Sequence, residues 1–328
     1  MNNQSTVRRL LRNKTVSLAL VTVAVVALFF FLSKDGSFLK TRNLRGILNM
    51  VSVTGTVAVG MACLLISGGV DLAASSEACL GGILCAMLLR AGISWPLALF
   101  LAIIYGAVAG AINAFLANVM NIMGFIATIG MSSVYTGLAK VFTDAKFISV
   151  NDKEFQKLGS SAIFGFVPVP FVIMLALMIL YGFMLRYTRF GRRSYMCGGN
   201  PQAARLSGMS PNRTTTVLYI NCGALSAFAG SVLASRMHSA TATAAQSVAI
   251  DAITASVLGG ISFMGGSGGI AGCFVGLMLL SAFNNGLNVV QLQSYWQLVA
   301  QGALLIIALC VEFFGERARL KALKRREP

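Results

Sequence analysis

Long apolar segments alternate with short polar ones along the whole chain. Each apolar segment is about twenty residues long, the length that a helix needs to cross a hydrocarbon core roughly 30 Å thick. The pattern predicts spans at 16–33, 47–66, 70–89, 95–118, 122–143, 167–186, 214–235, 250–264, 270–290 and 295–314. Glycines near Gly68 and Gly259 indicate that two of these segments are broken or re-entrant. We therefore expect an all-α integral membrane protein with about ten transmembrane helices in one domain over residues 1–328.

Composition and charge placement agree with this class. The chain is 56% hydrophobic and 11% charged, with a mean hydropathy of +0.78, which excludes an ordinary soluble domain. Its net charge of +16 is also typical of nucleic-acid-binding proteins, but the basic residues cluster before the first span, within 187–213 and after Gly315. Because these clusters alternate with spans, the positive-inside rule predicts cytoplasmic termini, a cytoplasmic 187–213 loop and no nucleic-acid partner.

Two other loops bear on this topology. Residues 144–166 carry mixed charge and are expected outside, either as a docking surface or as a solvated connector. The loop after the first span contains Lys34, Lys40, Arg42 and Arg45 and would also lie outside, which conflicts with the positive-inside rule.

Glycine pairs recur at matching offsets, at positions 68, 69 and 81 and again at 259, 260 and 272. They indicate either close helix packing or the trace of an internal repeat.

Enzyme motifs are missing from the sequence. A single histidine, His238, excludes a histidine-pair metal site, and no phosphate-binding loop of the form G-x-x-x-x-G-K-[ST] occurs. The stretch GSGGIA at 266–271 matches a dinucleotide fingerprint, but it lies between apolar segments and no acid follows it in NVVQL. The seven cysteines form no C-x-x-C pair. We expect no catalytic residue, metal or cofactor on this chain.

Three acids lie within or beside apolar segments: Asp71, Glu77 and Asp251. An ionised carboxylate there costs on the order of 3 kcal/mol, so each needs a solvating partner. The alternatives are a water-filled pathway or proton relay, or capping of a broken helix, which the preceding glycines favour for Asp71. We assign Asp71 and Asp251 to structure, which leaves Glu77 as the least explained.

Amide side chains also recur in the spans, and the candidates are Asn113, Asn118, Asn121, Asn284, Asn285 and Asn288. Asn284 and Asn288 are four residues apart and share one helix face. Amides offer both donors and an acceptor, which suits a neutral polyhydroxylated solute, although hydrogen bonds between helices explain them equally well.

The segment TRFGRRSYMCGGNPQAARLSGM begins at Thr188 and interrupts the apolar pattern. Asn200 and Pro201 form an N-cap and first-position pair, 202–207 suits a helix, and Gly208 suits its C-terminal end. The helix would be roughly 10 Å long, too short to span, so we expect it to dock against another protein. Glycines 191, 198, 199 and 208 are expected to permit sharp turns at its ends.

This segment resembles the loop of ABC importer permeases of the ribose and galactose type, within the wider family that includes branched-chain amino acid permeases. That loop has the form T-x-F-G-R followed by G-G-N-x-x-A-A-R-x-x-G. Further likenesses are LLISGGVDL (64–72), GFIATIGMSSVYTGLA (124–139), IDAITASVLGGISFMGGSGGIAG (250–272) and NNGLNVVQLQSYWQLVAQGALLI (284–306). Together they cover nearly all of 43–314.

The resemblance implies a transport subunit rather than an enzyme, with several partners. They are a second, identical or different, permease subunit, a cytoplasmic ATPase that holds ATP and magnesium, and an external solute-binding protein. The coupling residues that it implies are Arg189, Gly191, Arg192, Gly198, Gly199, Asn200, Pro201, Ala203, Ala204, Arg205 and Gly208. The candidate pathway residues are Asp71, Glu77, Asn113, Phe125, Thr128, Asp251, Asn284, Asn285 and Asn288.

The chain departs from the family pattern near the pathway. Relatives usually continue GG-[IV]-D-L with S-V-G, where this chain has Ala73, Ala74 and Ser75, followed by the unexpected Glu77. Relatives also tend to carry an acid two residues before the aspartate of their D-A-I motif, where this chain has Ala249. The expectation is a permease of the bacterial cell membrane that moves a monosaccharide or a similar small polar solute by alternating access. The alternatives are a proton-coupled secondary transporter, or an ABC permease for nucleosides, amino acids or a furanone signal.

Overall fold

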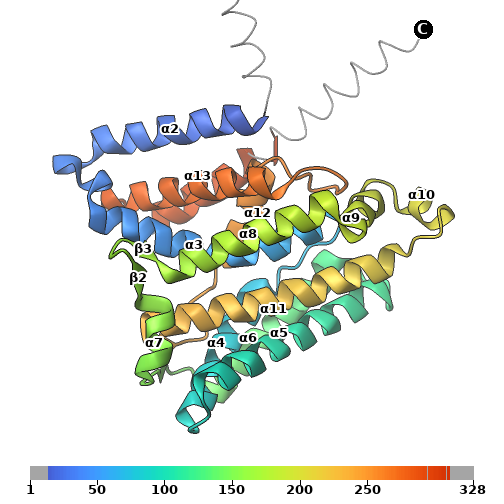
Figure 1. Cartoon of the computed structure of the whole chain (residues 1–328), viewed down its shortest axis with the longest axis horizontal. Coiled ribbons are helices and arrows are strands. Elements are labelled where there is room, and N and C mark those ends of the chain that lie inside the picture. The colour runs from blue at the N-terminus through green and yellow to red at the C-terminus, as the bar shows by residue number, and fades with distance from the viewer. Residues whose placement is uncertain (1–13, 294, 308, 311–328) are drawn as a thin grey trace, which may run out of the picture.

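The computed structural model describes residues 14–293, 295–307, 309 and 310, which form a mostly helical bundle (Figure 1). Its longer helices are α2 (Lys14–Leu32), α3 (Thr41–Ile66), α4 (Ala74–Arg90), α5 (Trp95–Asn118), α6 (Gly124–Thr143), α8 (Val169–Tyr187), α11 (Pro211–Met237), α12 (Val248–Leu258) and α13 (Ile270–Val289). Among the described residues, six helices are long and apolar enough to cross a membrane: α3, α5, α6, α8, α11 and α13. The helical membrane class is confirmed, whereas the count of ten spans stays a prediction.

Helices α3 and α11 form the centre of the bundle, and small residues let their neighbours approach. α11 packs against α3, α4 and α5. A Cβ atom added at Gly106 of α5 would lie 2.3 Å from the Gly223 carbonyl oxygen of α11, and one at Gly223 would lie 2.2 Å from the Gly106 oxygen. Backbones this close leave no room for a side chain, so these glycines pack helices together.

Two predicted spans are wrong as continuous helices, which confirms the expected breaks. The segment 70–89 begins irregularly, because α3 ends at Ile66 and α4 starts only at Ala74. The segment 250–264 contains α12 only to Leu258, and no helix is assigned from 259 to 269. Gly68 and Gly260 have φ angles of +84° and +85°, in the left-handed region that interrupts a helix and suits glycine.

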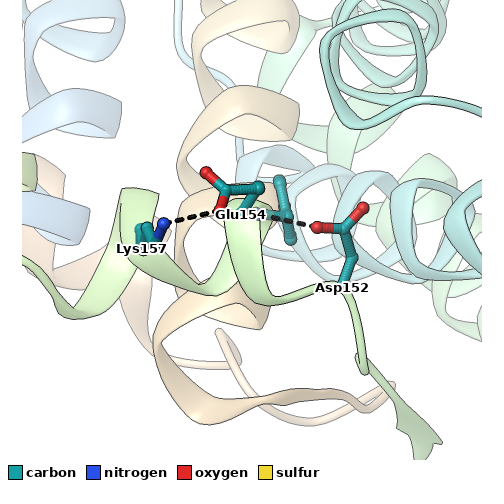
Figure 2. Close-up of polar contacts among 4 residues, drawn as sticks. Asp152, Glu154 and Lys157 are labelled. Atoms are coloured by element: carbon teal, nitrogen blue, oxygen red, sulfur yellow. Dashed lines mark hydrogen bonds and ion pairs between the residues drawn. The ribbon is translucent and has the colours of Figure 1, made fainter.

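The segment 144–166 folds onto the bundle rather than forming a plain connector. It contains β1 (Ile148–Ser149), which pairs with β4 (Ser239–Ala240), then α7 (Lys153–Ser160) and β2 (Ala162–Ile163), which pairs with β3 (Val167–Pro168). Figure 2 shows how α7 begins: the Asp152 carboxylate accepts a hydrogen bond of 3.0 Å from the Phe155 backbone N–H. Lys157 and Glu154 form an exposed ion pair one turn later.

Ser235 of α11 fixes α7 in place. Its hydroxyl donates to the Phe155 carbonyl oxygen at 2.5 Å and accepts from the Gly159 N–H at 2.9 Å. The Phe155 side chain is fully buried beneath α7.

The basic loop after α2 lies at the same end of the bundle as α7. It contains the 3-10 helix η1 (Lys34–Leu39), and the Arg45 guanidinium donates to the Ser160 carbonyl oxygen at 3.1 Å. The helices α9 (Arg189–Gly199) and α10 (Pro201–Leu206) lie at the opposite end (Figure 1). This basic loop and the 187–213 segment therefore lie at opposite ends of the bundle. The conflict between the loop and the positive-inside rule, seen in the sequence, persists in the structure.

Candidate functional site

The short helix predicted in the polar segment is present as α10. The Asn200 side-chain oxygen accepts hydrogen bonds from the backbone N–H groups of Gln202 at 3.1 Å and Ala203 at 3.0 Å. Pro201 occupies the first turn, and Gly208 has a φ of +76° just beyond the helix. The predicted N-cap, proline and terminal glycine are thus confirmed.

The helix α9 before it was not predicted, and it corrects the role given to three glycines. Gly191, Gly198 and Gly199 lie inside α9 and do not form turns. A Cβ atom at Gly191 would lie 2.3 Å from the Leu185 carbonyl oxygen, and one at Gly198 would lie 2.0 Å from the Ile66 oxygen. Gly191 and Gly198 permit close contact between backbone segments. Both positions therefore require glycine, but the prediction that these glycines form turns was wrong.

The coupling candidates divide into an inner and an outer face. Ala204 is buried, whereas Arg189, Arg192 and Arg205 are exposed and Leu206 exposes 92% of its surface. None of these arginines forms an ion pair with an acid among the described residues. An exposed apolar tip with unpaired guanidinium groups suits an acidic protein partner.

The end of α9 touches both broken segments. The Gly266 N–H donates to the Ile66 carbonyl oxygen at 2.8 Å, which joins the break after α12 to the break after α3. The position of a Gly198 Cβ atom lies 2.0 Å from that oxygen and 2.8 Å from the Gly266 nitrogen. Three backbone segments therefore meet without side chains between them, three residues before α10 begins at Pro201.

Four of the predicted pathway residues gather beside the first break. The Asn113 amide nitrogen of α5 lies 3.2 Å from both carboxylate oxygens of Asp71 and 2.9 Å from the Glu77 Oε1 atom. The Thr128 hydroxyl of α6 accepts from the Leu72 N–H at 3.1 Å. Asp71, Glu77, Asn113 and Thr128 are all fully buried. One amide thus holds two buried acids, and neither acid forms an ion pair with a described basic residue.

Asp71 also bonds the backbone at the start of α4, although the N-cap residue of that helix is Ala73 and no side chain caps it. Its Oδ1 atom accepts from the Ala73 N–H at 2.9 Å, just before α4 starts. Glu77 remains the less satisfied acid, because its Oε2 atom is buried with no hydrogen-bond partner among the described residues. The hydroxyl of Tyr105 is likewise buried and unpartnered, and the Tyr135 hydroxyl donates to the Ala109 carbonyl oxygen at 3.1 Å. These two tyrosines were missed, although a tyrosine within a span usually seeks a polar partner.

The other pathway candidates lie away from this cluster. On α13, the Asn285 side-chain oxygen accepts from the Asn43 amide at 2.8 Å, and the Asn288 amide donates to the Asn284 carbonyl oxygen at 3.1 Å. Asp251 lies in the first turn of α12 and accepts from the Ser247 hydroxyl at 3.0 Å. The nine candidates therefore do not form one site.

Phe125 lies in the first turn of α6, three residues before Thr128, but is 48% exposed. Asn43, the partner of Asn285, was also missed, since no local signal distinguishes it.

Comparison with known proteins identifies the family. Residues 43–309 match the family described as the branched-chain amino acid transport system / permease component. The ribose import permease protein RbsC of Bacillus subtilis (strain 168) is 38% identical over 278 residues, 84% of this chain and 86% of the relative. RbsC of Escherichia coli (strain K12) is 33% identical over 307 residues, covering 92% and 94% of the two chains.

A third relative is named for another sugar. The D-allose transport system permease protein AlsC of Escherichia coli (strain K12) is 31% identical over 293 residues, 89% of each chain. No solved structure matches the chain. The matches extend over the breaks, the buried acids and the α9–α10 segment, and they confirm the resemblance drawn from the motifs. The chain belongs to the family of branched-chain amino acid transport system permease components.

Proposed function

We propose that the chain is the membrane permease subunit of an ATP-driven importer for a monosaccharide or a chemically similar solute. Relatives that align over most of their length are named for ribose, D-allose and L-arabinose, which are all monosaccharides. These relatives favour this function over a proton-coupled secondary transporter and favour sugars over nucleosides, amino acids or a furanone. ATP and magnesium belong to a separate ATPase in this proposal.

The observation that carries the proposal is the contact between the end of α9 and both breaks. Because Gly198 abuts Ile66 and Gly266 through backbone atoms, a displacement of α9 and α10 must move the ends of α3 and of the loop before α13. The break after α3 carries Asp71, which Asn113 ties to α5. An ATPase that docks on α10 can thereby shift the bundle between outward-open and inward-open arrangements.

The proposed orientation follows from the two ends of the bundle. The α9–α10 end faces the cytoplasm, together with both termini, and the α7 end faces the external solute-binding protein. This places the loop from Lys34 to Arg45 outside, and the Arg45 bond to Ser160 supports that position. A second permease subunit completes the pathway across a bacterial cell membrane, and ten spans complete each subunit.

Arg205→Glu tests the docking surface. The change reverses one exposed charge on α10, so we expect less co-purified ATPase and less solute-stimulated ATP hydrolysis at an unchanged level of the chain in membranes. Arg90→Glu is the matched control, because Arg90 is an exposed arginine at the end of α4, and α4 contacts the β1 and β4 strands of the α7 end.

Uptake assays identify the solute class. They use labelled ribose, allose and arabinose in cells that also express the binding protein and the ATPase. Normal solute-stimulated hydrolysis by Arg205→Glu would contradict the docking surface. Uptake that survives ATP depletion but collapses with a protonophore would contradict the importer itself.

A further inference from the structure

A cavity of about 630 Å³ lies between the end of α8, the helix α9 and the start of α13. It is not part of the acid cluster or of α10. Its lining includes Phe183, Arg186, Tyr187, Arg192 and Gly269. No acidic residue lines it.

The cavity concentrates positive charge. The Arg186 guanidinium carbon lies 5.4 Å from the centroid of the Tyr187 ring, and Arg192 donates to the Tyr187 carbonyl oxygen at 3.3 Å. Tyr187 therefore holds two guanidinium groups beside one opening. Neither arginine has a carboxylate partner within the described part of the chain. An anion at this opening that accepts hydrogen bonds from both arginines neutralises their charge.

The floor of the cavity adds backbone donors. The Tyr195 hydroxyl donates to the Gly268 carbonyl oxygen at 2.9 Å and so fixes the segment before α13. α13 starts at Ile270, and no side chain caps its first turn. A Cβ atom added at Gly269 would meet nothing within 4 Å, so the space at this helix end is open. Uncapped N–H groups beside two arginines favour a phosphate group.

An apolar strip on α8 leads to the same opening. Ile179, Leu180 and Phe183 are each about 60% exposed and share one face of the helix through three- and four-residue spacings. α8 is long and apolar enough to cross a membrane, so an exposed apolar strip on it can contact acyl chains. The Tyr187 ring continues the strip, with its centroid 5.0 Å from that of Phe183. Charge at the helix end and apolar surface along the helix match the two halves of a phospholipid.

We propose that this cavity binds the headgroup phosphate of an anionic phospholipid, with an acyl chain along the exposed face of α8. Arg186 and Arg192 contact the phosphate, and the first turn of α13 donates to it. The site goes beyond the transport function proposed above. The proposed orientation places the cavity at the cytoplasmic leaflet; lipid binding itself does not depend on that orientation.

The test measures lipid retention by the purified full-length chain. Phosphatidylglycerol is titrated against phosphatidylethanolamine in mixed micelles, and bound lipid is counted by native mass spectrometry. Because each basic residue near an anionic lipid contributes about fivefold, Arg186→Gln with Arg192→Gln should weaken phosphatidylglycerol binding about thirtyfold. The matched control is Arg193→Gln, a neighbouring exposed arginine that does not line the cavity, with an effect of at most about fivefold.

A second variant separates loss of the site from loss of the fold. Gly269 has a φ of −174°, an extended conformation that any residue adopts. Gly269→Asp places a carboxylate where it caps α13 and repels a phosphate, so binding should be lost while circular dichroism and gel filtration stay unchanged. Arg192 also belongs to the predicted coupling residues, so the readout is lipid binding rather than transport.

Three results would overturn the proposal. They are equal binding of the two lipids, equal effects of the double variant and Arg193→Gln, and displacement of phosphatidylglycerol by inorganic phosphate. The last would assign the cavity to a free anion.

Discussion

Replacing Asn113 by leucine tests whether one amide holds the first break in place. Asn113→Leu keeps a side chain of similar size but removes the N–H groups that serve Asp71 and Glu77 at 2.9 to 3.2 Å. Leaving a buried acceptor without its hydrogen bond costs about 1 to 3 kcal/mol, so the loss of donors to two acids should cost about 2 to 6 kcal/mol. No solvent compensates, because all three side chains are fully buried.

The assay is unfolding of the detergent-solubilised chain by increasing amounts of dodecyl sulfate, followed by circular dichroism. Asn118→Leu is the matched control, since Asn118 lies near the end of the same helix and bonds Thr216 and Asn212 in a partly exposed position. Its loss should cost about 1 kcal/mol or less. A destabilisation by Asn113→Leu no larger than that of the control would refute the role of the amide.

A double-mutant cycle sharpens the result. Glu77→Gln exchanges one acid for a neutral side chain of similar shape, so it should relieve part of the cost of Asn113→Leu. Residues that share a hydrogen-bond network show coupling energies of about 0.5 to 3 kcal/mol. Strictly additive effects would mean that the two side chains do not interact.

Two further predictions concern backbone contacts. Gly198→Val places a branched side chain where a Cβ atom would already lie 2.0 Å from the carbonyl oxygen of Ile66, the last residue of α3, so we expect less folded chain in membranes. Gly137→Val is the control, because a Cβ atom there would meet nothing within 4 Å, and it should reach the normal level. Immunoblots of membrane fractions measure both levels. Ser235→Ala removes both of the hydrogen bonds by which α11 holds α7, so limited proteolysis within 144–166 should become several-fold faster. Ser133→Ala is the control, because it removes an exposed hydroxyl on α6, and it should leave the cleavage rate unchanged.

Local signals predicted much of the fold and part of the site. The apolar segments predicted the membrane class, and the Gly-Gly pairs at 68–69 and 259–260 predicted both breaks. Asn200, Pro201 and Gly208 predicted α10 with its cap and its end. Each of these features depends on residues within one or two turns, so it can be inferred without knowing what packs nearby.

The same reasoning failed where a residue's role depends on a distant segment. The residues next to Gly198 in the sequence predict a turn, because they carry no signal of the contacts with Ile66 and Gly266. The break glycines are also not equivalent position for position, since the positive φ falls on the first glycine of one pair and the second of the other. The internal repeat therefore stays a prediction.

By itself, the sequence determined that this is a helical membrane protein with two interrupted spans and a capped polar helix, because hydropathy, glycine and capping act over neighbouring residues. Only the tertiary structure decided which polar groups meet. Asp71 and Glu77 lie 42 and 36 residues before the amide that joins them, and the three backbone segments at Gly198 come from distant parts of the chain. Burial makes an unpartnered polar group costly but does not specify its partner, and helix packing makes that choice.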